Sequence, residues 1–410
     1  MKILTGPFEQ IITMNGLPLN GPAGDDRLEI IQRGGMVIEN NRIIDIGGFE
    51  NLRKKHTAEI EEINGSYILL PGFIDAHTHL CYAGSRSRDY AERIAGSTYR
   101  EILEKGGGIY DTVDHTRRAS FRELSDLTEQ RIMKHFENGI TTMEIKSGYG
   151  LNTVEELKML EVIRHLDKRT PPDLVATCLA AHVVPLEFSS SEAYLTHIIQ
   201  DLLPLVREKD LSGRVDIFIE KDAFSPEESF LYLSKAKKMG FDVTVHVDQF
   251  TSGGSDIAAR IKAVSADHLE VIDDSHIRML IDQDVVQTVL PGASIGLGMP
   301  FAPARKILDA GGCLAIASDW NPGSAPMGDL LTEASILSAS QKLNFAETMA
   351  GVTFRAARAL SLTDRGRLDI HMKADFVAFA SNDYREILYQ QGQLKPAIIW
   401  KNGNKHIKHT

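Results

Sequence analysis

The middle of the chain alternates strand-like and helix-like runs eight times, and this repetition limits the fold more than any other feature. The strand-like runs end close to His79, Ile145, Ala181, Glu220, His246, His268, Leu290 and Asp319. Helix-like runs, several with good N-terminal caps, separate them over Phe121–Glu137, Thr153–Leu166, Ser191–Arg207, Pro226–Met239, Ser255–Ala263, Asp274–Asp282, Ala304–Ala310 and Met327–Ser338. Eight such units in succession predict an α/β fold, a (β/α)8 TIM barrel.

A doubly wound open sheet is the alternative for alternating strands and helices. Such a sheet normally carries a glycine-rich phosphate-binding turn after its first strand. Here the first strand-like run ends in His77-Thr78-His79 instead. The run Gly106-Gly107-Gly108 follows a helix-like segment, which favours a structural or substrate-covering loop. The sequence therefore favours the barrel.

Both ends of the chain are rich in short strand-like runs broken by turn signals. Asn40-Asn41 separates two such runs near the N-terminus, and Asn402-Gly403 marks a turn near the C-terminus. The two ends together predict one small β-sandwich domain, built from residues 1–70 and 362–410. The barrel is expected to occupy residues 71–361.

The charge balance and the cysteines exclude some partners and compartments. The chain has 45 basic and 56 acidic side chains and a formal net charge of -11, which argues against nucleic acid and against an anionic membrane surface. Three widely spaced cysteines (Cys81, Cys178 and Cys313) argue against a disulfide framework and favour the cytoplasm. We expect no signal peptide and no membrane span, since no run approaches about 20 apolar residues.

Histidines are numerous, 14 in all, and several lie where barrel enzymes place their chemistry, at the C-terminal ends of the strands. His77 and His79 are two residues apart at the end of the first strand, so both can face the barrel interior. His246 ends the fifth strand, and Asp319 ends the eighth. Three imidazoles and one carboxylate suit a single zinc or iron ion.

A two-metal centre bridged by a modified lysine is the competing arrangement. Lys221 lies near the end of the fourth strand, and Lys146 ends the second. We favour one ion, because strand alternation places Lys221 out of phase with the inward-facing positions.

Two further histidines end strands without being needed as ligands. His182 ends the third strand, and His268 ends the sixth. Each can contact a substrate or carry a proton. The remaining histidines fall on helices, loops or terminal strands and are expected to be solvated: His56, His115, His135, His165, His197, His276, His371, His406 and His409.

These motifs carry a resemblance to a known family. The chain resembles the amidohydrolase superfamily and, within it, the imidazolonepropionase family, over nearly its whole length. The histidine pair after the first strand is common to the superfamily, whereas the runs 146–151 and 318–324 are more specific to the family. The resemblance rests on the runs 71–79, 106–109, 146–151, 181–185, 265–270 and 318–324.

The resemblance implies a hydrolase that opens the cyclic amide of 4-imidazolone-5-propanoate to N-formimidoyl-L-glutamate in histidine degradation. It implies that the ion is held by His77, His79, His246 and Asp319. It further implies substrate contacts by Arg86, Tyr99, Tyr149, His182, Asn321, Gly323 and Ser324.

The implied substrate is a small molecule that carries a carboxylate. Arg86 can bind a carboxylate through two hydrogen bonds, although Arg88 and Arg93 are rivals for this role. His268 and Asp319 are the candidates to accept the proton of water and return it to the leaving nitrogen. A homodimer is compatible with the resemblance.

One residue departs from the family pattern. Three residues after His246 the family carries a glutamate, whereas this chain has Gln249, a candidate catalytic and substrate-binding residue that can form a hydrogen bond but cannot accept a proton. Proton transfer then rests on His268 and Asp319, with Asp248 as a further candidate, or the substrate differs. The fourth strand also lacks a cysteine expected after its phenylalanine.

Two other functions stay open. One is a different mononuclear amidohydrolase or deaminase that acts on a small nitrogen heterocycle. Such deaminases usually keep the acidic residue that Gln249 replaces, and they lack the run 146–151. The other is a non-catalytic scaffold, but scaffolds typically lose the metal ligands that this chain retains.

Overall fold

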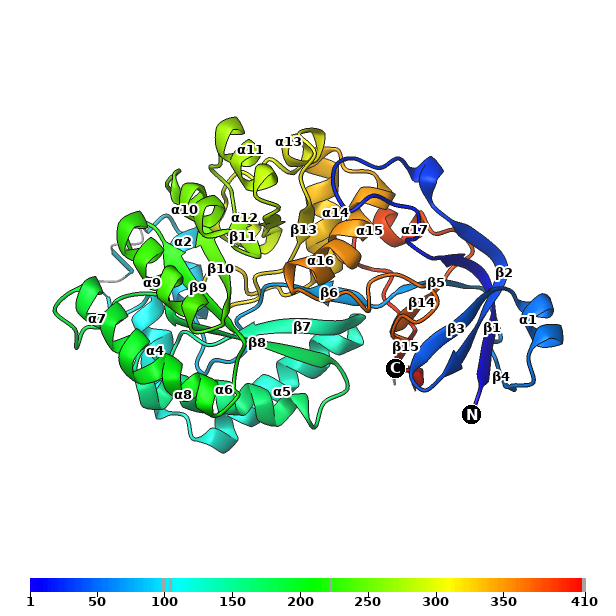
Figure 1. The fold of residues 1–410 in the computed structure, drawn as a ribbon, viewed down its shortest axis with the longest axis horizontal. Coiled ribbons are helices and arrows are strands. Elements are labelled where there is room, and N and C mark those ends of the chain that lie inside the picture. Colours follow the sequence, from blue (N-terminus) through cyan, green and yellow to red (C-terminus); the bar gives the residue numbers. More distant parts are fainter. Residues whose placement is uncertain (98–100, 103–104, 222, 408–410) are drawn as a thin grey trace.

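The computed structural model describes residues 1–97, 101–102, 105–221 and 223–407. It confirms the predicted fold class, because a (β/α)8 barrel carries a separate β-rich domain assembled from both ends of the chain (Figure 1). In Figure 1 the barrel lies to the left and the terminal domain, with the marked chain ends, to the right.

Eight parallel strands form the barrel in chain order: β6 (Phe73–Asp75), β7 (Ile140–Lys146), β8 (Asp173–Ala181), β9 (Arg214–Ile219), β10 (Asp242–Val247), β11 (Ser265–His268), β12 (Val286–Val289) and β13 (Leu314–Ile316). Because helices cover the outside and side chains fill the inside, both faces of a strand are buried, as all seven residues of β7 show.

The segments that follow β13 and β6 close the circle of strands. The N–H of Asp319 donates to the carbonyl of His77 at 3.1 Å, and the N–H of His79 donates to the carbonyl of Trp320 at 3.0 Å. Closure of the barrel therefore fixes the backbone of three predicted ligands: His77, His79 and Asp319.

Helices surround the strands and begin largely where their capping residues predict. Ser120 and Ser225 cap α5 and α9 with complete capping boxes. The last predicted helix begins at Leu330 instead of Met327, because the side chain of Asp329 accepts the N–H of Thr332. The barrel helices are α2 (Ser87–Ile94), α4 (Ile109–Arg118), α5 (Phe121–Glu137), α6 (Thr153–Asp167), α7 (Ser191–His197), the π-turn η2 (Ile198–Leu202), α8 (Leu203–Glu208), α9 (Pro226–Lys238), α10 (Gly254–Ile261), α11 (Asp274–Asp282), α12 (Pro291–Leu297), α13 (Ala304–Asp309), α14 (Leu330–Gln341), α15 (Phe345–Gly351) and α16 (Phe354–Ala359).

The terminal domain is one mixed sheet in which β16, β15, β14, β5, β1, β2 and β3 follow one another and β4 also pairs with β1. The predicted hairpin at Asn40-Asn41 joins β2 to β3, with φ angles of 51° and 64°. The strands are β1 (Ile3–Ile12), β2 (Ile30–Glu39), β3 (Arg42–Gly48), β4 (Glu59–Glu62), β5 (Tyr67–Pro71), β14 (Phe376–Ala380), β15 (Ile398–Lys401) and β16 (Asn404–Ile407), accompanied by η1 (Asp25–Arg27), α1 (Phe49–Lys55) and α17 (Glu386–Tyr389).

Strand β1 was not predicted from the sequence, and it joins the two parts of this sheet. Its register against β2 shifts between Thr5 and Phe8, and this irregularity interrupts the alternation that identifies a strand. Phe8 packs edge to face on Trp400, with ring centroids 5.8 Å apart, and Nε1 of Trp400 donates to Glu61 at 2.9 Å. Side chains from both chain ends thus share one small core.

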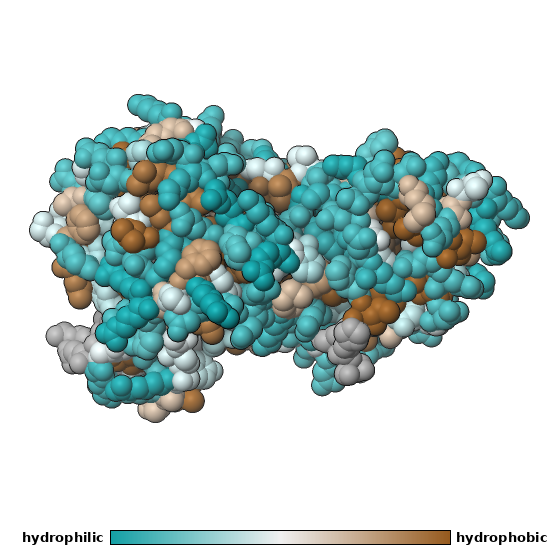
Figure 2. All heavy atoms as spheres, turned by 90° about the horizontal axis from the view of Figure 1, so that it is seen from below, coloured by the Kyte–Doolittle hydropathy of each residue, from teal (hydrophilic) through white to brown (hydrophobic). Residues whose placement is uncertain are grey.

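Polar residues cover much of the surface of the molecule, and the cysteines lie inside it. Figure 2 shows one face of the molecule, where hydrophilic residues predominate and apolar ones lie in small groups. Cys81, Cys178 and Cys313 are buried and unpaired. No helix within the described ranges is long and apolar enough to cross a membrane.

One acidic residue of the barrel connects it to the terminal domain. Oδ2 of Asp173, at the start of β8, lies 2.7 Å from Nζ of Lys373 and 2.8 Å from Nζ of Lys401, and it also pairs with Arg365. Burial raises the pKa of Asp173, but the three cations outweigh burial and hold this pKa well below its ordinary value. The contact therefore stabilises the folded chain only while Asp173 is ionised.

We expect Asp173→Asn to lower the free energy of unfolding by about 2 kcal/mol at pH 7. Because the folded-state pKa is depressed, this stabilisation is present above the unfolded-state pKa of about 4 and is lost as the pH falls further. Urea unfolding at pH 7 and pH 3 checks this: the difference in the free energy of unfolding between the two proteins should be smaller at pH 3 than at pH 7, because the stabilisation is lost progressively as the pH falls towards the folded-state pKa. The exposed Asp282→Asn is the control, and equal stability of Asp173→Asn and wild type at pH 7 would contradict the prediction.

Candidate metal centre

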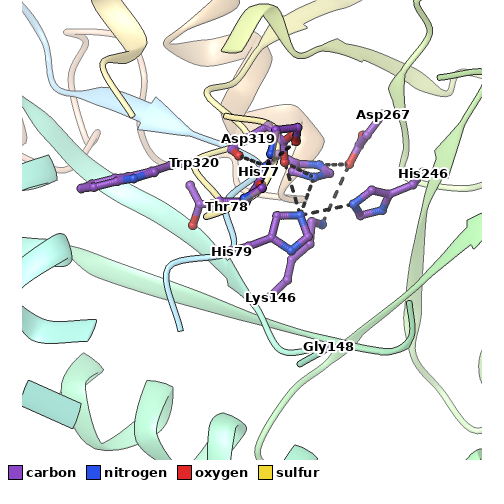
Figure 3. Close-up of polar contacts among 12 residues, drawn as sticks. His77, Thr78, His79, Lys146, Gly148, His246, Asp267, Asp319 and Trp320 are labelled. Carbon is purple, nitrogen blue, oxygen red and sulfur yellow. Dashed lines mark hydrogen bonds and ion pairs between the residues drawn. The ribbon is translucent and has the colours of Figure 1, made fainter. Parts of the chain in front are cut away.

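The four predicted ligands come together in the barrel (Figure 3). His77 and His79 follow β6, His246 lies on β10 and Asp319 follows β13. Strand β6 ends at Asp75, earlier than the predicted end at His79. All four candidate ligands are nevertheless buried and close together.

The donor atoms of these side chains are spaced as one ion requires. Nε2 of His79 lies 3.3 Å from Nε2 of His77, 3.4 Å from Nε2 of His246 and 3.3 Å from Oδ1 of Asp319. Nε2 of His77 lies 3.5 Å from Oδ1 of Asp319. Donors in a tetrahedron around zinc, at about 2.0–2.1 Å from the ion, are about 3.3–3.4 Å apart. These four distances therefore match the spacing of donor atoms around one such ion.

Carboxylates behind two of the rings determine which ring nitrogen is left for an ion. Nδ1 of His77 lies 2.7 Å from Oδ2 of Asp267, and Nδ1 of His246 lies 3.0 Å from Oδ2 of Asp216. Each carboxylate favours a proton on Nδ1, so Nε2 keeps its lone pair. Oδ1 of Asp319 is buried and has no hydrogen-bond partner among the described residues. The free electron pairs of Nε2 of His77 and His246 and of Oδ1 of Asp319 point into the same space, where a bound cation could accept them.

Burial keeps these imidazoles in the form that binds metal. It lowers the pKa of His79 to about 3 and that of His246 to about 4, and it holds the pKa of His77 well below its ordinary value. A neutral imidazole is the metal-binding form. Two overlapping groups of the described residues could hold an ion: His77 and His79 with Asp319, and His77 and His246 with His268. Since His77 belongs to both, we interpret them as one centre.

Asp75 secures the segment on which the first two ligands lie. Its carboxylate accepts from the N–H of Ser318 at 3.0 Å and from Ser318 Oγ at 2.5 Å. Oδ2 of Asp75 also lies 2.7 Å from Nε2 of His135. The expectation that His135 is solvated is wrong: its ring is completely buried between Asp75 and Trp320, because helix α5 turns this residue towards the barrel.

The loop 147–151, which follows β7, is wrapped around one buried carboxylate. Glu156 accepts from the N–H of Gly148 at 3.1 Å, of Gly150 at 2.8 Å and of Leu151 at 2.8 Å. Gly148 has a φ of 110°, and a Cβ there would lie 2.8 Å from a backbone carbonyl, so the turn requires glycine. This loop determines where its central tyrosine lies.

Tyr149 and His182, both predicted to contact substrate, lie beside the donor atoms. Nδ1 of His182 donates to the carbonyl of Gly148 at 3.0 Å, and the ring stacks on His79 with centroids 5.4 Å apart. The ring of Tyr149 lies 6.1 Å from that of His79. Burial lowers the pKa of His182 to about 3, so its Nε2 carries a lone pair, and burial raises the pKa of Tyr149, which keeps its hydroxyl a donor. Tyr99 lies outside the described residues.

His268, the predicted proton carrier, is the last residue of β11. Its ring lies 5.8 Å from that of His77 and 5.3 Å from that of His246. Burial lowers the pKa of His268, but Glu270, 3.5 Å from Nδ1, and Asp319 outweigh burial and raise this pKa. The site therefore includes one histidine that tends to retain its proton.

Arg86, the predicted carboxylate clamp, is buried at the start of α2. Its Nε donates to Asp89, which also accepts from the N–H of Gly108 at 2.8 Å. A Cβ built on Gly323 would lie 3.1 Å from Nη1 of Arg86, so the guanidinium reaches the loop after β13. Among the described residues no hydrogen bond engages Nη1 or Nη2, and both can therefore meet a substrate carboxylate.

The two rival arginines are placed differently. Arg88 is exposed on the outside of its helix. Arg93 donates to the carbonyl of Gly296 at 3.1 Å and to that of Gly323 at 3.2 Å, so it supports the loop that Arg86 approaches. Arg86 is thus the arginine best placed to bind an anion.

The predicted contacts Asn321, Gly323 and Ser324 form a closed turn beside Asp319. Oδ1 of Asn321 accepts from the N–H of Gly323 at 2.7 Å and of Ser324 at 2.8 Å, and Nδ2 donates to the carbonyl of Asp319 at 2.7 Å. The hydroxyl of Ser324 donates to Oδ2 of Asp319 at 3.4 Å. The turn thus supports a candidate ligand, and contact with substrate stays a prediction.

Gln249 lies buried after β10, between two residues held by hydrogen bonds. The N–H of Phe250 donates to Glu220 at 2.8 Å. Asp248 has a φ of 55° and accepts from Oγ of Ser255 at 2.5 Å, at the start of α10. The expectation that Asp248 shares in proton transfer is wrong, because the strand alternation ends before it and its carboxylate caps a helix.

Neither lysine considered for a two-metal centre is placed to bridge ions. Lys221 is exposed after β9. Lys146 is completely buried, with its Nζ 2.8 Å from Oε2 of Glu144 and 2.8 Å from Oδ2 of Asp216. An ammonium group between carboxylates already has its partners, so the geometry favours a single ion.

Sequence reasoning missed the acidic residues beneath the donor atoms. A signal was present, because each is a charged residue in a barrel strand, which is buried on both faces, and three of the four lie between apolar neighbours. Such a charge requires a partner inside the barrel. These residues are Asp75, Glu144, Asp216 and Asp267.

Comparisons with known proteins agree with this geometry. The model of the amidohydrolase family matches residues 68–406. Imidazolonepropionases of Fusobacterium nucleatum and Bdellovibrio bacteriovorus are 40% and 38% identical, over 92% and 99% of this chain and 92% and 96% of their own lengths. That of Bacillus cytotoxicus is 39% identical over 92% of this chain and 90% of its own.

Solved structures with a similar fold include two other hydrolytic enzymes. An adenosine deaminase from Xanthomonas campestris with bound zinc has a TM-score of 0.72 at 17% identity, covering 99% of this chain and 92% of that one. A Xaa-Pro dipeptidase has a TM-score of 0.71 at 16% identity, covering 100% of both chains. These likenesses show the fold alone. By the family match and by identities near 40% to curated relatives over nearly the whole chain, this chain belongs to the imidazolonepropionase family of the amidohydrolases.

Proposed function

We propose that the chain hydrolyses the ring amide of 4-imidazolone-5-propanoate and releases N-formimidoyl-L-glutamate, a step of histidine degradation. The observation that carries this proposal is the combination, in one site, of donor atoms for a single ion with a buried arginine that can hold a carboxylate. Membership of the imidazolonepropionase family supports the same reaction. Three unpaired cysteines favour the cytoplasm as its compartment.

The proposed ligands of the ion are His77, His79, His246 and Asp319, a set that suits both zinc and iron. When bound, the ion would supply Lewis acidity, which lowers the pKa of water and polarises a carbonyl group. Ser324 holds one carboxylate oxygen of Asp319 at 3.4 Å, and Asp267 and Asp216 hold two of the rings.

Proton transfer is assigned to Asp319, and stabilisation of the developing negative charge to His268. As the oxygen of water bonds to the ring carbonyl carbon, Asp319 accepts the proton that the water loses. The bond from this carbon to the ring nitrogen then breaks, and the proton passes from Asp319 to the leaving nitrogen. His268, which tends to stay protonated, donates a hydrogen bond to the carbonyl oxygen while it carries negative charge. Gln249 contributes a hydrogen bond and no proton transfer.

Substrate orientation is assigned to three further side chains. Arg86 binds the propanoate with its Nη groups while Asp89 holds its Nε. The hydroxyl of Tyr149 donates to the substrate, and Nε2 of His182 accepts a hydrogen bond from it. Since His182 is held through Nδ1 by Gly148, its acceptor atom has a defined direction.

Turnover in water labelled with heavy oxygen tests the reaction. We expect loss of the ultraviolet absorbance of freshly prepared imidazolonepropionate, and a product of the mass of N-formimidoylglutamate with a single labelled oxygen in its new carboxylate. No ammonia should appear. Release of ammonia would instead support a deaminase, and no turnover by ion-loaded protein would overturn the substrate assignment.

A further inference from the structure

A lysine lies in the interior of the barrel, where a charge is costly. Lys146 ends β7, and its side chain is completely buried. Figure 3 shows it close to His79 and linked to Asp267. The proposed reaction gives this ammonium group no role, and burial of a charge is unfavourable unless the charge has partners.

Three carboxylates from three different strands surround this ammonium group. Nζ of Lys146 lies 2.8 Å from Oε2 of Glu144 on β7, 2.8 Å from Oδ2 of Asp216 on β9 and 4.0 Å from Oδ2 of Asp267 on β11. All three carboxylates are buried. The lysine therefore joins β7, β9 and β11, three strands that are not adjacent to one another in the barrel.

Two of these carboxylates are the groups that hold proposed ligands of the ion. Oδ2 of Asp216 lies 3.0 Å from Nδ1 of His246, and Oδ2 of Asp267 lies 2.7 Å from Nδ1 of His77. The same two oxygen atoms face Lys146. One ammonium group thus reaches two neighbouring imidazoles, one after β6 and one on β10, each through a single oxygen.

Charge makes the lysine necessary for this arrangement. Besides Lys146, the cation nearest to these carboxylates among the described residues is Arg214, whose Nε lies 4.0 Å from Glu144 and which forms no ion pair with Asp216 or Asp267. Without Lys146, those two carboxylates would lie buried without a compensating cation, which is strongly unfavourable. The two carboxylates would move or take up a proton, and the imidazole rings that they hold would lose their orientation.

We propose that Lys146 is a positioning residue for the ion site, which holds the carboxylates of Asp216 and Asp267 in place and through them orients His246 and His77. This inference rests on the proposed function, because it takes those histidines as ligands. It assigns no contact between Lys146 and substrate.

Zinc affinity of ion-free protein, measured by competition with a chromophoric chelator, tests the proposal. We expect Lys146→Met to weaken zinc binding by about 10- to 100-fold. Lys401→Met is the matched control, because Lys401 is also buried and lies 2.6 Å from Oδ2 of Asp375, but in the terminal domain. It should lower stability and leave zinc affinity unchanged.

Two further variants keep the test decisive if Lys146→Met does not fold. Glu144 contacts neither histidine, so Glu144→Gln should bind zinc like wild type. The double variant Lys146→Met/Glu144→Gln removes one charge of each sign, and it should still bind zinc about 10- to 100-fold more weakly. Wild-type affinity in either lysine variant would overturn the proposal and leave the ion site standing. If the wild-type chain itself binds no zinc, the proposed ion site fails instead.

Discussion

His246→Ala is expected to lower kcat/KM for imidazolonepropionate by at least about 10³-fold, which corresponds to about 4 kcal/mol of lost transition-state stabilisation. The reason is that this imidazole is the proposed donor from β10, whose Nε2 faces Nε2 of His79 at 3.4 Å. Zinc content after dialysis should fall in parallel with activity.

A control separates loss of the ion from loss of the fold. His165→Ala changes a histidine on α6, outside the barrel interior, and should leave activity and metal content unchanged. Equal unfolding midpoints of the ion-free His246→Ala and wild-type chains would show that the fold is intact. Retention of both zinc and activity by His246→Ala would contradict the assigned ligand set.

Arg86→Met is expected to raise KM for imidazolonepropionate by about 100-fold and to change kcat by less than tenfold. Hydrogen bonds to a charged group contribute about 1.5–3 kcal/mol. Without Arg86 the propanoate would lose these bonds equally in the bound substrate and in the transition state, so KM changes more than kcat. The side chain of Asp89 would remain, buried and without its guanidinium partner, and would further disfavour an anion.

The matched comparison uses a neighbouring arginine and a truncated substrate. Arg88→Met, on the exposed side of α2, should leave KM unchanged. With an imidazolone that carries an ethyl group in place of the propanoate, wild type and Arg86→Met should have equal KM values. If the KM values of Arg86→Met and wild type differ as much with the ethyl analogue as with imidazolonepropionate, Arg86 does not bind the propanoate group.

The features that depend on local pattern could be predicted from the sequence. The order of the barrel strands follows from alternating strand and helix runs, and the capping residues located the helix starts of α6 and α9. His77 and His79 could be paired because they are two residues apart, and the strand-end positions of His246 and Asp319 brought them to the same end of the barrel.

Features that depend on contacts between distant segments could not be predicted. His135 is buried because its Nε2 finds a hydrogen-bond partner in the carboxylate of Asp75, which is far away in the sequence. Asp248 turns away from the site because a positive φ ends the strand before it, and local alternation does not reveal that. The role of Lys146 depends on Asp216 and Asp267 from two other strands. Partners of this kind appear only when the barrel is closed.

Zinc titration of ion-free protein, with turnover of imidazolonepropionate measured at each step, shows whether His77, His79, His246 and Asp319 hold one ion that the hydrolysis requires. We expect no turnover without the ion, a linear rise as zinc is added, and a plateau at one ion per chain. A plateau at two ions per chain, or full turnover by the ion-free chain, would contradict this expectation.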